Sequence, residues 1–242
     1  MIYIILIVFS VLCCAMAIAF FAFETEMKRK YDQEQTETLA AEQAQALAKP
    51  KRVLNLVNTS PRVRLIYMVV TCVVLLVLAV VRAHYFPDTP LSVNLKIIAC
   101  VALLWPCAWI DVKTMRISNK MLLWGCIARV SILAAELVMQ EDGFLYNIPQ
   151  ELIAMVAMLV VTLLCRLVMP GSIGFGDAKL MMIMALFLGS SCLWDAIFMS
   201  MIVAFFVAVF LMLSKRAGRQ DVMPFAPFLM LGTTLMAFFV EV

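Results

Sequence analysis

Two aspartates beside apolar segments are the residues of this 242-residue chain best suited to chemistry. Asp111 follows an apolar run that ends at Ile110, and Asp177 closes a Gly-x-Gly-Asp sequence that begins at Gly174. Two carboxyl groups a few ångströms apart cannot both ionise cheaply, so they share one proton and titrate as a unit. The ionised carboxylate can deprotonate a water molecule while the protonated one polarises a carbonyl group. The pair therefore predicts hydrolysis without a metal or a cofactor.

The residue pattern around Asp177 supports this interpretation. Gly174 and Gly176 carry no side chain, so the backbone can turn sharply into a helix and a substrate strand can approach it closely. Either aspartate alone is explained more simply, as a helix cap or as a polar residue at the end of a membrane helix. Because both aspartates are predicted at the same membrane face, the catalytic interpretation is favoured.

The composition requires a membrane environment for these residues. The chain is 65% hydrophobic and 14% charged, with a mean hydropathy of +1.01, whereas a soluble domain is roughly half apolar and about a quarter charged. The net charge is only +3, and the basic residues occupy loops rather than one stripe, so nucleic acid is excluded as a partner. All eight cysteines lie in apolar runs without CxxC spacing, and hence no structural zinc site is predicted.

The elements that position the aspartates are predicted to be membrane-spanning helices. A helix needs about 20 apolar residues to cross the hydrocarbon core, and we expect an all-α, polytopic transmembrane helix bundle of about eight spans. The predicted spans are Met1–Phe23, Leu65–Val81, Leu95–Ile110, Met121–Met139, Leu152–Met169, Ala178–Trp194, Ala196–Ser214 and Met223–Val240.

The distribution of Lys and Arg predicts the orientation of the bundle. Fifteen of the nineteen lie in the loops 24–64, 111–120, 170–179 and 215–222, and two lie in the loops on the other side. The first set is therefore cytoplasmic, and the N-terminus and C-terminus are both outside. We expect an N-terminal transmembrane anchor over 1–23, a charged cytoplasmic helix and linker over 24–64, and a membrane-embedded core over 65–242. Both aspartates then lie near the cytoplasmic face.

Three blocks of sequence resemble one known family. The segment from Asp111 through Lys113, Arg116 and Asn119 to Lys120 is similar to the first aspartate motif of the type IV prepilin peptidases. The segment from Gly174 to Leu180 resembles their GxGD box, and the segment from Pro224 to Gly232 resembles their final Pro-Phe-rich segment. The resemblance implies an aspartic endopeptidase that removes short basic leaders from prepilin or pseudopilin precursors at the cytoplasmic face of a prokaryotic plasma or inner membrane.

The resemblance also assigns roles to residues. It implies that Asp111 and Asp177 are catalytic and that neither metal nor cofactor takes part. Other motif residues would support the catalytic loops or contact lipid headgroups: Gly174, Gly176, Lys179, Lys113, Arg116 and Asn119, with Pro224, Pro227 and Gly232 in the final segment. Ser118 stands where the family commonly has proline. The four-cysteine module of the larger enzymes is missing, so the chain resembles the short forms that serve tight-adherence pili or archaeal flagellins, and N-methyltransferase activity is not expected.

Three alternatives remain open from the sequence. A proton- or cation-coupled transporter would use the same aspartates as ion ligands. A presenilin-like GxGD protease would act on other substrates, but its Tyr-Asp and Pro-Ala-Leu sequences are missing. A catalytically silent assembly protein for pili or secretion would have the same sequence features. Arg129 and Glu136, two turns apart in one predicted span, are equally consistent with a functional pair and with a structural ion pair.

Overall fold

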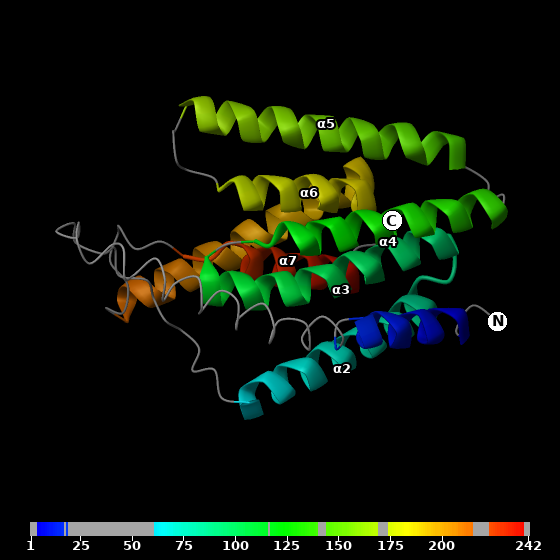
Figure 1. Ribbon diagram of the computed structural model, residues 1–242, viewed down its shortest axis with the longest axis horizontal. Helices are drawn as coiled ribbons and strands as arrows, with labels where there is room; N and C mark the ends of the chain where they lie inside the picture. Colours follow the sequence, from blue (N-terminus) through cyan, green and yellow to red (C-terminus); the bar gives the residue numbers. More distant parts are fainter. Residues whose placement is uncertain are drawn as a thin grey trace.

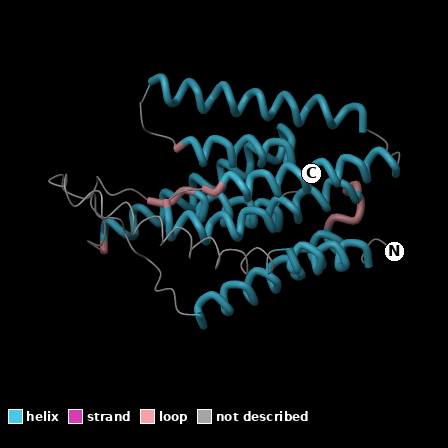
Figure 2. Tube along the Cα trace, viewed as in Figure 1, coloured by secondary structure: helices cyan, strands magenta, loops and turns pink. Residues whose placement is uncertain are grey.

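The part of the chain that the computed structural model describes is helical apart from short turns and loops. It comprises residues 4–16, 18, 61–115, 117–139, 144–168, 174–214 and 223–239, and no strand occurs within it (Figure 2). A first apolar helix, Ile4–Met16, precedes the six longer elements. These are α2 (Pro61–Tyr85), α3 (Leu91–Thr114), α4 (Asn119–Met139), α5 (Phe144–Val168), α6 (Phe175–Leu213) and α7 (Ala226–Phe239). The predicted all-α membrane bundle is confirmed. Of the predicted cytoplasmic segment 24–64, residues 24–60 lie outside the described residues, and residues 61–64 belong to α2.

Successive helices run back and forth along one bundle axis (Figure 1). Five of them, α2 to α6, are long and apolar enough to cross a membrane, and Ile4–Met16 and α7 are shorter apolar helices. The junctions α3–α4 and α5–α6, together with the start of α7, lie at one end of the bundle, on the left of Figure 1. The motifs containing Asp111, Asp177 and Pro224 therefore gather at this end.

Helix α6 combines two of the predicted spans and breaks at a different residue from the expected one. The sequence placed the boundary between Trp194 and Ala196, but the non-helical residue is Gly189, with φ 66° and ψ −171°. Only glycine adopts this combination of angles readily. Beyond Gly189 the chain turns and runs back along the bundle (Figure 1), so the two halves of α6 account for the sixth and seventh predicted spans.

Helix α3 is the centre of the bundle. Its membrane-length segment is 83% buried, whereas those of α2 and α5 are 22% buried, and α3 contacts α2, α4, α6 and α7. One sequence prediction needs correction here: the two basic residues predicted in loops on the other side, Arg82 and Lys96, lie within helices, because α2 extends to Tyr85 and α3 begins at Leu91. Arg82 and Lys96 are consequently buried inside the bundle, because each has polar partners there.

Candidate active site

Asp111 lies in the last turn of α3, and only 4% of it is exposed. Its Oδ2 accepts a hydrogen bond of 2.9 Å from the backbone N–H of Ala226, the first residue of α7. The first N–H groups of a helix have no partner within the helix, and they point toward an anion at the N-terminus. The backbone of the preceding residue, Phe225, also donates to this carboxyl group, whereas the next residue, Pro227, has no N–H to offer. The final segment thus connects to the site through the start of α7.

Asp177 lies in the first turn of α6, three residues after the N-cap residue Gly174. Its carboxyl group accepts a hydrogen bond from the backbone of Gly174, as the acidic residue of a capping box does. Asp177 also interacts electrostatically with Asp111. The chain therefore brings the two predicted aspartates together from separate helices, each held by backbone donors.

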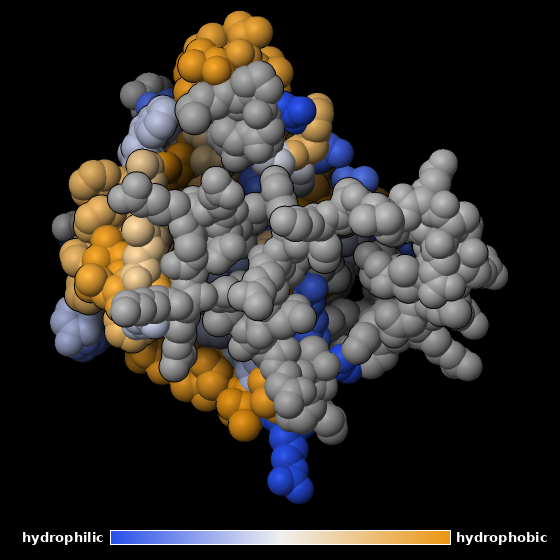
Figure 3. Space-filling model, turned by 90° about the vertical axis from the view of Figure 1, so that its left-hand side faces the viewer, coloured by the Kyte–Doolittle hydropathy of each residue, from blue (hydrophilic) through white to orange (hydrophobic). Residues whose placement is uncertain are grey.

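Both carboxyl groups line one cavity of about 360 Å³, which is a normal size for a ligand site. Its lining residues come from the end of α3 and the starts of α4 and α6. Figure 3 shows this end of the bundle, where hydrophilic residues appear between strongly apolar flanks. The residues that line it are Asp111, Met115, Ile117, Asn119, Gly174, Phe175, Gly176, Asp177 and Lys179.

The turn after α3 packs tightly against the GxGD segment. A Cβ atom on Gly176 would lie 3.1 Å from Cβ of Ile117 and 3.4 Å from its backbone nitrogen. Met115 adopts a left-handed conformation with φ 50°, and its N–H closes the turn onto the carbonyl oxygen of Asp111 at 2.9 Å. Gly176 is therefore required for the close approach that sets α6 beside the end of α3.

Of the predicted supporting residues, Lys179 and Asn119 line the cavity, whereas Lys113 lies against an aromatic ring outside its lining. Lys179 Nζ donates to Oδ1 of Asn119 at 3.1 Å and so joins the first turns of α6 and α4. The Nζ atom of Lys113 lies 4.2 Å from the centre of the Trp109 ring, which is cation–π geometry. Arg116 lies outside the described residues. Only the contact between Lys179 and Asn119 belongs to the lining of the cavity.

Gly232 lies outside the lining of the cavity and affects the site through the packing of α7. A Cβ atom there would lie 2.2–2.4 Å from Oγ, N and Cα of Ser200, in the second half of α6. Such a contact is impossible without moving a helix, so glycine at this position allows α7 to pack directly on α6. The position of α7 in turn decides where Ala226 meets Asp111.

Two aromatic residues that support or line the site, Tyr67 and Phe175, were not among the predicted site residues. The Tyr67 hydroxyl donates to the carbonyl oxygen of Trp105 at 2.7 Å, and its ring stacks on Trp109 at 4.6 Å; it braces the turn of α3 before Asp111. Phe175 lines the cavity and carries the Arg166 guanidinium 4.0 Å from its ring centre. Phe175 could have been predicted as a site residue, because it occupies the x position of Gly-x-Gly-Asp. Tyr67 could not, because it is a single tyrosine in an apolar span with no motif around it.

The geometry permits acid–base chemistry by two carboxyl groups on a molecule in the cavity. Among the described residues no group of three or more His, Cys, Asp and Glu is arranged to hold a metal ion. That Asp111 and Asp177 are catalytic stays a prediction, as do the roles of the residues around them.

Comparison with known proteins identifies one family. Residues 97–213 match the model of the type IV leader peptidase family. The match includes both aspartates and ends before Pro224. Neither a curated protein nor a solved structure matches the chain significantly.

Proposed function

Because this chain belongs to the type IV leader peptidase family through residues 97–213, we propose that it is an aspartic endopeptidase with Asp111 and Asp177 as its catalytic pair. The family carries peptidase activity and takes prepilin-type substrates. The chain is a multi-pass membrane protein. The finer proposal is that it cuts the short basic leader from prepilin or pseudopilin precursors at the cytoplasmic face of the cell membrane.

The observation that carries the proposal is the meeting of two carboxyl groups in one open cavity. One carboxylate takes a proton from a water molecule, which attacks the scissile carbonyl carbon, while the other carboxyl group donates its proton to the carbonyl oxygen. The tetrahedral intermediate then collapses: one of its hydroxyl groups returns a proton to the pair, the leaving nitrogen takes a proton from the pair, and the C–N bond breaks. The two carboxyl groups return to their singly protonated state without any other reactant.

The position of the cavity supports the substrate class. Its lining residues lie at the end of the bundle where α3 ends and α6 begins, beside helices with many exposed apolar side chains such as the second half of α6. A precursor with an apolar helix and a polar leader can keep its helix in the membrane while the scissile bond reaches the cavity. The Lys- and Arg-rich loops at this end support a cytoplasmic orientation. Lipid headgroups are the partners that we propose for Lys113 and Arg116.

The two remaining alternatives, a transporter and a silent assembly protein, differ in the arrangement of acidic residues that they require. A transporter would need its acidic residues on a polar path through the bundle, whereas this pair lies at one end. A silent assembly protein would share the geometry entirely, so only an activity measurement separates it from a peptidase.

The test is cleavage of a candidate prepilin co-expressed with the wild-type chain, with Asp111→Asn and with Asp177→Asn. Asn keeps the shape of the side chain and removes its acid–base chemistry. We expect wild type to shorten the precursor and each variant to lose at least about 10³-fold in rate. The matched control is Asp88→Asn, which changes an exposed aspartate in the loop after α2 and should cut normally. Normal cleavage by either active-site variant would refute the catalytic assignment.

A further inference from the structure

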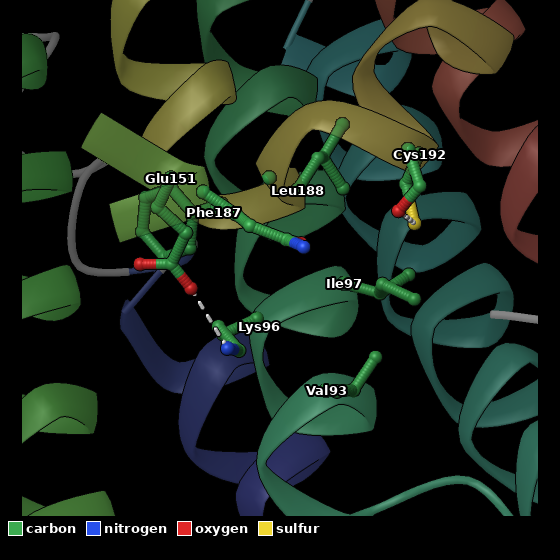
Figure 4. Close-up of a pocket in the computed structure, with 10 residues that line it drawn as sticks. Val93, Lys96, Ile97, Glu151, Phe187, Leu188 and Cys192 are labelled. Carbon is green, nitrogen blue, oxygen red and sulfur yellow. Dashed lines mark hydrogen bonds and ion pairs between the residues drawn. The ribbon is translucent and has the colours of Figure 1, made fainter. Parts of the chain in front are cut away.

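Four charged side chains form a closed ring inside the bundle, away from the cavity. Lys96 of α3 contacts Glu136 of α4 and Glu151 of α5, each at 2.9 Å. Arg129 of α4 contacts the same two carboxylates, Glu136 at 3.2 Å and Glu151 through a short contact. All four residues are at least 94% buried. Figure 4 shows Lys96 and Glu151 from this ring, joined beside the chain around Phe187 and Leu188.

The ring is electrically complete. Each carboxylate meets both cations, each cation meets both carboxylates, and the formal charges sum to zero. Burying single charges is costly, and a pair of replacements by apolar residues would often be as stable. Buried ionic groups of this kind are best understood as devices that select one register between packed elements. A cavity of only about 60 Å³ adjoins the ring, so the charges face protein rather than a ligand.

The ring also holds the break in α6. Arg129 Nε donates at 2.8 Å to the carbonyl oxygen of Leu186, three residues before Gly189. A helix that ends leaves carbonyl groups without partners, and an arginine can satisfy them. Cγ of Glu151 lies 3.8 Å from where a Cβ of Gly189 would be. Arg129 therefore fixes the end of the first half of α6, the half that begins with Asp177.

We propose that this ring is a positioning device for the active site: it fixes the register of α3 against the first half of α6, and thereby the separation of Asp111 and Asp177. Lys96 and Asp111 share α3, and Leu186 and Asp177 share the first half of α6. A helix is a stiff rod that rises 1.5 Å per residue, so a shift at the ring is transmitted to the carboxyl groups. The catalytic consequence rests on the proposed function, but the geometric one does not.

The first experiment measures the separation without using catalysis. In a chain whose native cysteines are replaced, Asp111→Cys and Asp177→Cys are joined by thiol cross-linkers of increasing length. With the ring intact, the short reagent should join them. Adding Arg129→Gln should remove the short-reagent product and keep the long-reagent product. Retention of the short-reagent product would overturn the proposal, even if the chain proves not to be a peptidase.

The matched control is Glu136→Gln, which removes one charge from the same ring. Glu136 bonds Lys96 and Arg129, on α3 and α4, and leaves the contacts of Arg129 with Leu186 and Glu151 in place. We expect this variant to keep the short-reagent product. Equal losses in Glu136→Gln and Arg129→Gln would show that the ring merely stabilises the bundle, and would refute the register role.

The second experiment measures cleavage with Asp111 and Asp177 restored. Arg129→Gln should lower kcat about 10- to 100-fold with little change in KM, because a misplacement near 1 Å costs about that much. Arg129→Lys should fall between it and wild type, since lysine keeps the charge but cannot hold Leu186 and both carboxylates together. If Arg129→Gln does not accumulate in membranes, Arg129→Lys carries both measurements. If a variant has altered cross-linking but an unchanged kcat, the register of the helices does not affect catalysis. That result would overturn the catalytic part of the proposal.

Discussion

The two ends of the bundle use carboxylates in opposite ways. At one end, Asp111 and Asp177 line an open cavity of about 360 Å³ and receive hydrogen bonds from backbone donors. At the other, Glu136 and Glu151 are held by two cations beside a cavity of about 60 Å³. The first arrangement brings like charges together with space for a reactant, and the second neutralises every charge with almost no free volume.

This difference separates carboxylates that hold neighbouring helices together from carboxyl groups that have space for a reactant. A carboxylate with two buried cationic partners holds those partners in place. Two carboxyl groups that face each other share a proton and can pass it to a substrate. The same residue type is therefore structural in one half of the molecule and suited to chemistry in the other.

The largest expected effect comes from making the same chemical change at both ends. Glu151→Gln should destabilise the folded bundle by about 3–5 kcal/mol, because removing one partner leaves buried cations uncompensated. Asp111→Asn should leave stability close to that of wild type and abolish cleavage. Thermal unfolding in detergent micelles, with cleavage measured on the same preparations, tests both statements. If Asp111→Asn were the more destabilising change, the contrast between the two ends would be wrong.

The sequence predicted the cavity end better than the ring end, for a physical reason. The residues of the cavity lie in short motifs, and the alternation of spans places Asp111 and Asp177 at the same end. The ring joins three helices, α3, α4 and α5. Two of its residues, Lys96 and Glu151, stand near the ends of predicted spans, where snorkelling is normal. Arg129 and Glu136 were recognised as a possible pair from their spacing, but their partners on α3 and α5 depend on packing that periodicity does not encode.

The position of the break in α6 was also not predictable from the sequence. Hydropathy located a boundary near Asp195, the charged residue between two apolar runs, yet Asp195 is an exposed residue within helix and the break is at Gly189. A glycine within an apolar run signals a break only when the backbone there has positive φ, which requires knowledge of the surrounding contacts. Arg129 and Glu151 supply those contacts.

A glycine substitution at the ring end gives the next largest effect. Gly189→Ala places a side chain at φ 66° and ψ −171°, a conformation that costs an L-residue of order 1–3 kcal/mol. The added Cβ meets only Cγ of Glu151 at 3.8 Å, so the cost arises from the backbone rather than from a clash. The unfolding midpoint should fall accordingly. An unchanged midpoint would mean that the break in α6 is not under the constraint described here.

The corresponding substitution at the cavity end should affect activity more than stability. Gly176→Ala brings a Cβ to 3.1 Å from Cβ of Ile117, so α6 must move by a few tenths of an ångström relative to the turn after α3. We expect kcat to fall about tenfold. Gly125→Ala is the control: its Cβ would lie 2.7 Å from the flexible end of Leu103 and 3.3 Å from Cγ2 of Ile183. Neither side chain lines the cavity, so this variant should cut at the wild-type rate. Equal losses of activity would place the effect in general packing.

The smallest effect concerns the one described lysine that lines the cavity, Lys179. Its bond to Asn119 is exposed, so Lys179→Met should cost no more than about 1 kcal/mol of stability and change kcat/KM by about threefold or less. A double-mutant cycle with Asn119→Ala should give a coupling near 0.5 kcal/mol or less. A loss of a hundredfold or more would instead mean that the ammonium group acts on the aspartates. The cavity would then balance its charges as the ring does, and the distinction between the two ends would have to rest on free volume alone.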